Sequence, residues 1–309
     1  MSIAITVVGY GNVGRVLTNL LLGSDWNMEL NIMDPADYLT GAFLDLKHAS
    51  GLQPKKQLYF NREEVFKRSD YVFFTAGIPS KHGTSRLSTV KDNLQLVHDI
   101  FGGKQLRNNM RIVAITNPVD VITAAIVSTT NLPKEQVVGT GTFLDSMRFS
   151  YYLAELAELK PQRVEALILG EHGESCVPIV SHSKCSGNPL LENPSFTNER
   201  IEQATYQTLH AAFEIRKTEP GTSMAVSHCA LRIMEYWMQP TETVIPISVL
   251  IDSEHAKWLA LERPICMSLL VSISSKGIKL LKPMQLEKEE LNALKQSAQI
   301  LKEYQGFLK

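Results

Sequence analysis

Residues 9–14 read Gly-Tyr-Gly-Asn-Val-Gly, three glycines spaced as G-x-G-x-x-G near the start of the chain. An apolar run, Ile3–Val8, leads directly into it, and an amphipathic segment from Val13 to Leu22 follows. A second apolar run then ends at Asp34, twenty residues beyond Gly14. A strand, a G-x-G-x-x-G turn, a helix and an acid after the next strand form the pattern of a dinucleotide-binding unit.

Each residue type in this turn has a physical role. Gly9 permits the tight turn, Gly11 lets the backbone approach a pyrophosphate, and Gly14 lets helix and strand pack closely. The exposed N–H groups and the dipole at the start of the helix, where Asn12 and Val13 lie, attract the anion. The sequence therefore predicts that the whole turn contacts a dinucleotide.

Asp34 predicts which dinucleotide binds. Its carboxylate can accept both ribose hydroxyls of an adenosine, and it would repel a 2′-phosphate. We therefore expect NAD rather than NADP as the cofactor. The alternative is a glycine-rich turn in an unrelated α/β protein, which the order and spacing of the pattern disfavour.

Length and composition narrow the class of protein. With 309 residues the chain is long enough for a large core and two domains. A formal net charge of −1 gives no reason to expect nucleic acid or an anionic membrane as a partner. No apolar run approaches the roughly 18 to 20 residues of a membrane span, and the start lacks a signal-peptide pattern. The four cysteines show no paired spacing, so we expect reduced thiols and a cytoplasmic protein.

Strand-like runs recur through the first half of the chain, with helical patterns between most of them. They are Ile3–Val8, Leu30–Met33, Tyr71–Thr75, Arg111–Thr116 and Gln136–Gly139. This alternation predicts a doubly wound parallel sheet with helices on both faces, as in a Rossmann fold. Ligands bind beyond the carboxyl ends of such strands, so Thr75, Ala76, Gly77 and Asn117 are candidate cofactor contacts.

The pattern changes after Leu144. We expect a helix over Ser146 to Leu159, a strand over Val164–Leu169 and a loop from Ser181 to Asn198. Further elements follow in the second half: a helical stretch from Asn198 to Trp237 broken near Pro220-Gly221, two β-type runs at Thr243–Ile251 and Ile265–Ile273, and a final helix. The expected organisation is an NAD-binding Rossmann domain over 1–143 and an α+β substrate domain over 144–309.

Four short groups could carry chemistry. They are Gly170–Glu174 around His172, Leu144–Arg148 with Asp145 and Arg148, Gly83–Arg86, and Asn117-Pro118. Each also has a simpler explanation. These explanations are a packed histidine, an intrahelical ion pair between residues at i and i+3, a solvated loop arginine, and a turn after a strand.

Taken together, the groups supply what hydride transfer at a 2-hydroxy acid requires. A histidine such as His172 exchanges a proton with the hydroxyl, because its pKa lies near the working pH. A carboxylate such as Asp145 holds the tautomer of the imidazole and stabilises its charged form. Arg148 could grip a substrate carboxylate in a two-bond fork, and Arg86 could stabilise charge on the reacting oxygen.

In these motifs the chain resembles the L-lactate/malate dehydrogenase family over nearly its whole length. The motifs that carry the resemblance are Gly9–Gly14, Asp34, Gly41–His48, Thr75–Gly77, Arg86, Asn93, Asn117–Asp120, Leu144–Phe149 and Gly170–Glu174. The resemblance implies an NAD-dependent dehydrogenase and a homodimer or homotetramer. It also implies that Gly41–His48 and the helix after Arg148 lie at the subunit contact.

The resemblance implies a role for each matching residue. His172 is the proton donor and acceptor, Asp145 its partner and Arg148 the carboxylate clamp. Arg86 is the arginine of a mobile loop. Two asparagines, Asn93 and Asn117, join the cofactor contacts, and Asn117 also binds substrate. Thr222, in Gly221-Thr222-Ser223, resembles the threonine in the pocket wall of lactate dehydrogenases.

One position departs from the family. Malate enzymes have arginine, and lactate enzymes glutamine, at the place where this chain has Ser80. A malate carboxylate enclosed without a cation would be an unpaired buried charge, and breaking such a pair costs about 3–5 kcal/mol. We therefore expect lactate-like substrates to be favoured over malate. The alternative is a malate enzyme in which Lys81 or His82 supplies the cation.

Two other classes of function fit parts of the sequence. An NAD- and metal-dependent glycosidase uses cysteine and histidine as metal ligands, and Cys176 lies four residues after His172. No second such pair accompanies these two residues, so we expect no metal site. A non-catalytic NAD-binding protein is the other alternative, which the presence of all the reactive groups disfavours.

Overall fold

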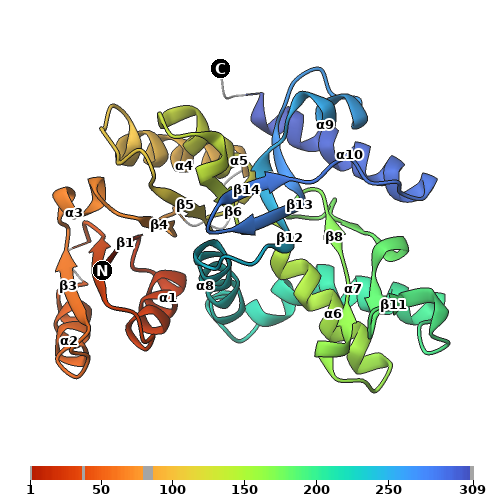
Figure 1. The fold of residues 1–309 in the computed structure, drawn as a ribbon, viewed down its shortest axis with the longest axis horizontal. Coiled ribbons are helices and arrows are strands. Elements are labelled where there is room, and N and C mark those ends of the chain that lie inside the picture. Colours follow the sequence, from red (N-terminus) through yellow and green to blue (C-terminus); the bar gives the residue numbers. More distant parts are fainter. Residues whose placement is uncertain (1, 37–38, 79–85, 307–309) are drawn as a thin grey trace.

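The computed structural model describes residues 2–36, 39–78 and 86–306 (Figure 1). The helices and strands that position the site are β1 (Ile3–Val8), α1 (Asn12–Leu22), β2 (Met28–Met33), α2 (Thr40–Ser50), β3 (Lys56–Phe60), α3 (Glu63–Lys67), β4 (Tyr71–Phe74), α4 (Arg86–Phe101), β5 (Arg111–Ala114), α5 (Val119–Thr129), η2 (Lys134–Gln136), β6 (Val137–Gly139), α6 (Phe143–Leu156), β7 (Val164–Glu165), β8 (Ile168–Leu169), β9 (Val177–Pro178), β10 (Lys184–Cys185), β11 (Asn188–Pro189), α7 (Asn198–Arg216), α8 (Met224–Met238), β12 (Thr243–Leu250), α9 (Ser253–Trp258), β13 (Cys266–Ser274), β14 (Gly277–Leu280) and α10 (Lys288–Gln305).

The fold is organised around one nine-stranded sheet. Six parallel strands run in the order β3-β2-β1-β4-β5-β6, which confirms the predicted doubly wound sheet. Strands β12, β13 and β14 continue the same sheet in antiparallel orientation. The second half of the chain therefore supplies one edge of the sheet that the first half begins. Strands β3 and β14 were not expected from the sequence.

Alternating side chains of β1 explain why both faces of the sheet are covered. Ile5 and Val7 join a core cluster with residues of α1 and α8, whereas Val8 joins a second cluster with residues of α3, α4 and α5. Figure 1 shows α1 and α8 on one side of the sheet and α4 and α5 on the other. Helix α8 comes from the second half, so it packs the two halves together.

The strand order reverses between β1 and β4, and this switch point fixes the cofactor crevice. The chain leaves β1 towards β2 on one side, and β4 leads towards β5 on the other. The residues after both strands meet at the same edge of the sheet. Thr75 donates its backbone N–H to Val8 O (2.9 Å), and its hydroxyl donates to Gly9 O (2.8 Å).

The predicted strand Val164–Leu169 is extended at both ends but is not continuous: it forms two short strands, β7 and β8, in different sheets. Glu165 pairs with Lys184, whereas Leu169 pairs with Val177. Between them, the backbone N–H of Ala166 donates to a serine hydroxyl on α6, at 2.9 Å. The next N–H, that of Leu167, also donates to a serine hydroxyl, at 3.1 Å. Side-chain acceptors thus replace a neighbouring strand at the middle of the segment.

The predicted helices of the second half are confirmed. The break near Pro220 separates α7 from α8. The final helix, α10, buries Leu294, Ala298 and Leu301 in a core cluster that also holds residues of β8 and β13.

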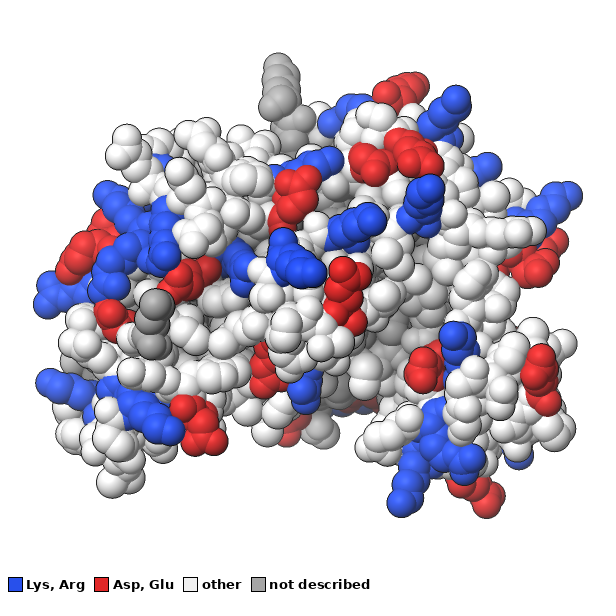
Figure 2. All heavy atoms as spheres, in the orientation of Figure 1, with Lys and Arg blue, Asp and Glu red and all other residues white. Residues whose placement is uncertain are grey.

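No helix in the described ranges is long and apolar enough to cross a membrane. Figure 2 shows basic and acidic side chains interspersed on the visible face, in keeping with a near-neutral chain.

Candidate active site

His172, Asp145 and Arg148 come together, as the sequence predicted. His172 Nδ1 lies 2.6 Å from Asp145 Oδ2, and Arg148 lies 3.6 Å from Asp145 Oδ1. Asp145 and Arg148 share one face of α6 because they are three residues apart on the helix. The side chains of His172, Asp145 and Arg148 are 21%, 10% and 13% exposed. Solvent and salt therefore screen these ionic contacts only weakly, and each side chain keeps a small part of its surface accessible to solvent.

Three backbone N–H groups hold the loop that carries His172. They belong to Gly170, Glu171 and His172, which follow β8 directly. Gly170 donates to Ser268 O on β13 at 3.0 Å, and Glu171 donates to Ser297 Oγ on α10 at 2.8 Å. His172 donates to Asp120 Oδ2 on α5 at 2.9 Å. Three elements far apart in sequence therefore fix the backbone on which the imidazole stands.

The surroundings of His172 favour its charged form. Burial lowers the pKa of His172, but the negative charge of Asp145 and the hydrogen bond to it outweigh burial. Asp120 raises the pKa further and Arg148 lowers it, and the net pKa lies above the ordinary histidine value. An imidazolium held in this way is a suitable proton donor near neutral pH.

Asp120 is a second acid beside the histidine that sequence reasoning did not single out as a site residue. It is 2% exposed, and burial raises its pKa to about 6, although the hydrogen bond from the His172 backbone N–H lowers it. The available signal was its place in the Asn117–Asp120 motif. Ser268 and Ser297, which also hold the loop, carry no sequence signal of this kind.

The glycine-rich turn has the geometry that a dinucleotide requires. Gly9 has φ +96°, and a Cβ on it would lie 2.5 Å from the Ala76 backbone nitrogen. A Cβ on Gly14 would lie 2.1 Å from Gly9 O, so this glycine permits the close packing of α1. A Cβ on Gly11 would meet no atom within 4 Å. Open space therefore faces Gly11, at the N-terminus of α1, where a pyrophosphate would fit.

Asp34 lies beside this turn, at the end of β2. Its Oδ2 accepts the Tyr10 backbone N–H at 2.8 Å, and its Oδ1 accepts the Ala36 N–H at 3.0 Å. Each carboxylate oxygen can accept a further hydrogen bond, so both stay available to ribose hydroxyls. The contact with Tyr10 fixes the carboxylate next to the glycine-rich turn. This placement fits the predicted role of Asp34.

Asn93 and Asn117 differ in their environment. Asn93 is buried and accepts the Ile78 N–H at 2.7 Å, and its amide donates to Asn117 O at 3.2 Å. It therefore ties the chain after Gly77 to the end of β5. Asn117 is exposed, and no hydrogen bond joins its side chain to another residue of the described ranges. The amide of Asn117 is the one left available for a ligand.

Helix α8 connects the cofactor turn to the substrate side. The Ser227 hydroxyl donates to Val13 O at 3.2 Å. Cys229 is buried, and the charges of Arg148 and Asp145 act on the pKa of its thiol. Burial is the main reason that the pKa of Cys229 rises to about 12. Thr222, half-buried, lies two residues before this helix.

Some predicted residues lie outside the described part of the chain. Ser80, Lys81 and His82 are among them, and so is the side chain of Arg86, whose backbone begins α4.

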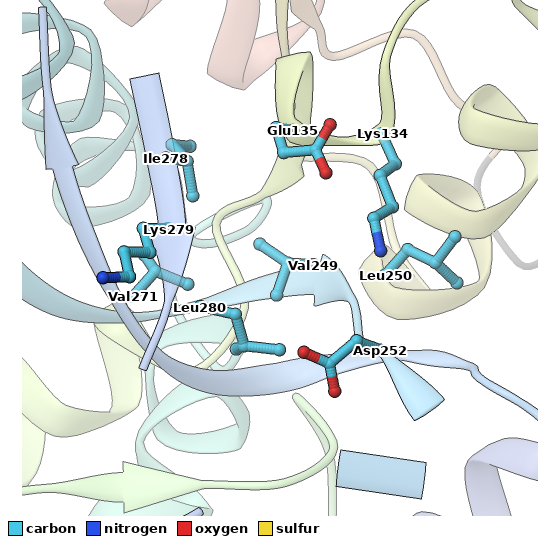
Figure 3. Close-up of a pocket in the computed structure, with 9 residues that line it drawn as sticks. All are labelled: Lys134, Glu135, Val249, Leu250, Asp252, Val271, Ile278, Lys279 and Leu280. Atoms are coloured by element: carbon cyan, nitrogen blue, oxygen red, sulfur yellow. The ribbon is translucent and has the colours of Figure 1, made fainter. Parts of the chain in front are cut away.

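A cavity of about 240 Å³ lies elsewhere, between η2 and strands β12 to β14. Figure 3 shows Lys134, Glu135 and Asp252 around the apolar Val249 and Leu280. None of the predicted site residues lines this cavity.

Within the described ranges, no group of three or more His, Cys, Asp or Glu side chains is placed to hold a metal ion. Burial raises the pKa of the Cys176 thiol well above its ordinary value.

Comparisons with known proteins agree on one family. Residues 3–139 match the NAD binding domain of lactate/malate dehydrogenases, and residues 142–305 match the alpha/beta C-terminal domain of the same family. L-lactate dehydrogenase 1 of Staphylococcus aureus (strain MRSA252) is 32% identical over 305 residues, covering 97% of this chain and 95% of that protein. L-lactate dehydrogenase 2 of Peribacillus psychrosaccharolyticus is 30% identical, with 97% and 94% covered.

Solved structures show the same fold. The minor L-lactate dehydrogenase from Enterococcus mundtii, in a ligands-bound form, superposes with a TM-score of 0.89 at 24% identity, covering 100% of this chain and 99% of that chain. The malate dehydrogenase from Picrophilus torridus, in its apo form, gives 0.88 at 25% identity, covering 99% and 97%. With both halves of the chain matched, the protein belongs to the lactate/malate dehydrogenase family, whose NAD-dependent members oxidise and form 2-hydroxy acids.

Proposed function

We propose that the protein transfers a hydride between NADH and C2 of a short 2-oxo acid, forming an L-2-hydroxy acid. One observation supports this most: the 2.6 Å contact between His172 and Asp145, beside Arg148. NADH, when bound, supplies the hydride. His172 donates its proton to the carbonyl oxygen as the hydride adds to carbon, and Asp145 stabilises the imidazolium before this step.

Arg148 is the proposed clamp for the C1 carboxylate. A guanidinium donates two parallel hydrogen bonds to a carboxylate, a geometry that lysine lacks. Its 3.6 Å contact with Asp145 holds the guanidinium near the imidazole. Arg86 is proposed to stabilise charge on the reacting oxygen, and Asn117 to contact substrate and the nicotinamide ribose. Thr222 is proposed for the wall of the substrate pocket.

The remaining cofactor contacts are proposed at the switch point of the sheet. They are Gly9, Gly11, Asn12, Val13, Gly14, Asp34, Thr75, Ala76, Gly77 and Asn93. Open space at Gly11 and the placement of Asp34 support this set. We also propose that residues 1–143 and 144–309 act as cofactor and substrate domains.

We propose that lactate-like substrates are favoured over malate, because Ser80 offers no positive charge to a distal carboxylate. The test is NADH oxidation measured against pyruvate, oxaloacetate and bulkier 2-oxo acids. Pyruvate or a bulkier 2-oxo acid should give a higher kcat/KM than oxaloacetate. If oxaloacetate is strongly preferred, Lys81 or His82 supplies the cation, and Lys81→Gln and His82→Gln would show which. Inactivity with every 2-oxo acid would refute the proposed reaction.

Ser80→Arg gives a sharper test of the same proposal. An arginine facing the substrate should raise the ratio of kcat/KM for oxaloacetate to that for pyruvate by roughly tenfold or more, since one buried ion pair is worth several kcal/mol. The ratio serves as its own control, because a general defect lowers both terms. An unchanged ratio would mean that residue 80 does not face the substrate.

A homo-oligomer is also proposed, with a cytoplasmic location. Two contacting helices, α6 and α7, carry exposed large apolar side chains: Met147, Tyr151, Tyr206, Leu209 and Phe213. Exposed apolar clusters of this kind are typical of subunit contacts. Sedimentation velocity should give a dimer or tetramer, and a monomer at micromolar concentration would contradict this proposal.

A further inference from the structure

The loop that carries His172 contacts the C-terminal helix α10 through a closed ring of hydrogen bonds. Ser297, on α10, has no solvent-exposed surface. Its Oγ accepts the Glu171 backbone N–H at 2.8 Å and lies 3.2 Å from the Ser175 Oγ. The Ser175 hydroxyl in turn contacts the Glu171 carboxylate. Two of the three residues, Glu171 and Ser175, flank His172 in the sequence.

Counting protons identifies the main acceptor of the Ser175 hydroxyl. Ser175 has one hydroxyl proton, and the Glu171 carboxylate can only accept, so that proton goes to Glu171. The same hydroxyl is directed at Ser297 Oγ, 3.2 Å away, which is its second and more distant acceptor. The bonds run from the Glu171 N–H to Ser297 Oγ, and from the Ser175 hydroxyl to the Glu171 carboxylate and to Ser297 Oγ. Ser297 Oγ therefore accepts from both ends of the loop, from the Glu171 N–H and from the Ser175 hydroxyl.

Close packing leaves little room for the loop to shift. Gly170 has φ +97°, and a Cβ on it would lie 2.6 Å from Ser297 Oγ. The loop backbone thus lies directly against the serine. On its other sides the loop is held by Ser268 and by Asp120. Without the Ser297 hydroxyl, Glu171 would lose the acceptor for its N–H.

We propose that Ser297 is a positioning residue for His172, acting through the backbone of residues 170–175 to hold the imidazole against Asp145. This inference depends on the proposed function, in which His172 transfers the proton. Ser297 touches neither substrate nor cofactor in this scheme. The C-terminal helix then contributes to catalysis by fixing the angle of approach of the imidazole.

The test is Ser297→Ala. Alanine has the highest helix propensity, so the variant should keep α10 intact and fold. With the 2-oxo acid that the unchanged protein reduces fastest, kcat should fall about tenfold, because small misplacements of a catalytic group have large effects on rate. KM for NADH should stay the same. The pH at which reduction is half lost should move to a lower value, because a looser contact with Asp145 raises the pKa of His172 less.

Two further variants separate positioning from stability. The control is Ser272→Ala, which removes a buried serine hydroxyl on β13, away from the loop. This hydroxyl donates to Glu242 at 2.9 Å. The control variant should leave kcat and the pH profile unchanged. Ser175→Ala breaks the same ring at a second point, so its effect combined with Ser297→Ala should be less than the product of the two single effects.

A second readout needs no turnover. Amide hydrogen exchange of the peptide spanning residues 170–176 should accelerate at least severalfold in Ser297→Ala and not in Ser272→Ala, because the Glu171 amide loses its acceptor. If the unchanged protein reduces no 2-oxo acid, the proposed function fails while the exchange result still decides whether Ser297 holds the loop. Unchanged exchange, or an unchanged pH profile and kcat in an active enzyme, would overturn the inference.

Discussion

Asp145→Asn should disable proton transfer while leaving the fold in place. Asparagine has the size of aspartate and can still accept a hydrogen bond from His172, so the geometry of α6 should persist. The variant removes the negative charge that lies 2.6 Å from His172 Nδ1. Burial, which lowers the pKa of His172, is then no longer outweighed.

The size of the effect follows from how little solvent screens the pair. His172 and Asp145 side chains are 21% and 10% exposed, so the contact resembles a buried ion pair more than a surface one. Removing one partner of such a pair costs about 3–5 kcal/mol. If all of it appears in the transition state, kcat/KM for reduction falls by about two to four powers of ten. The retained hydrogen bond places the expected loss near the lower end.

The assay is the pH profile of NADH oxidation, from pH 5 to 9, for both proteins. Reduction requires the protonated imidazole, so the rate of the unchanged protein should fall as the pH rises through the raised pKa of His172. In Asp145→Asn the fall should begin at a lower pH. The pair should also stabilise the folded state most below the pKa of an unfolded histidine, and this advantage should be lost as the pH rises through the folded pKa. A profile with unchanged midpoint and rate would refute this role of Asp145.

Three further predictions concern other parts of the site. Gly11→Ala should fold normally but bind NADH at least tenfold more weakly, because the new Cβ takes up the open space beside the turn. Gly14→Ala should instead lower the unfolding free energy by about 1–3 kcal/mol, because its Cβ would lie 2.1 Å from Gly9 O, and equal melting temperatures of Gly14→Ala and the unchanged protein would contradict this. In the unchanged protein the pKa of Asp120 is about 6, above the 3.8 of a solvent-exposed aspartate, so the unfolding free energy should fall by up to ~3 kcal/mol as the pH rises from 4 to 6. Asp120→Asn should remove this part of the pH dependence, which urea titrations of both proteins at both pH values would measure. Asp34→Asn should raise the ratio of kcat/KM for NADPH to that for NADH by roughly tenfold, since a charge that repels the 2′-phosphate is removed, and an unchanged ratio would place the ribose elsewhere.

The sequence predicted the elements with strong local patterns. The run Ile3–Val8 with its glycine-rich turn, the pairing of Asp145 with Arg148 on one helix face and the break before α8 all depend on short-range spacing, and all are confirmed. Strand β3 was not predicted because Lys56–Phe60 is half-buried at the sheet edge and mixes polar with apolar residues. No local signal showed that β12 would pair with β6.

The support of the histidine loop could not be predicted in the same way. Asp120, Ser268 and Ser297 act through contacts with residues that are 52, 98 and 126 positions away in the chain. Their residue types are ordinary for a helix or strand, so only the folded arrangement reveals what they hold. The family resemblance named the reacting side chains but not the residues behind them.

The central claim is that the His172 imidazole and the Arg148 guanidinium face the same substrate beside the nicotinamide. A crystal structure with NADH and a non-reactive 2-oxo acid analogue tests it directly. We expect His172 Nε2 within about 3 Å of the analogue's carbonyl oxygen, with Arg148 donating two hydrogen bonds to its carboxylate. An analogue bound in the crevice but contacting neither side chain would exclude His172 as the proton donor and Arg148 as the carboxylate clamp.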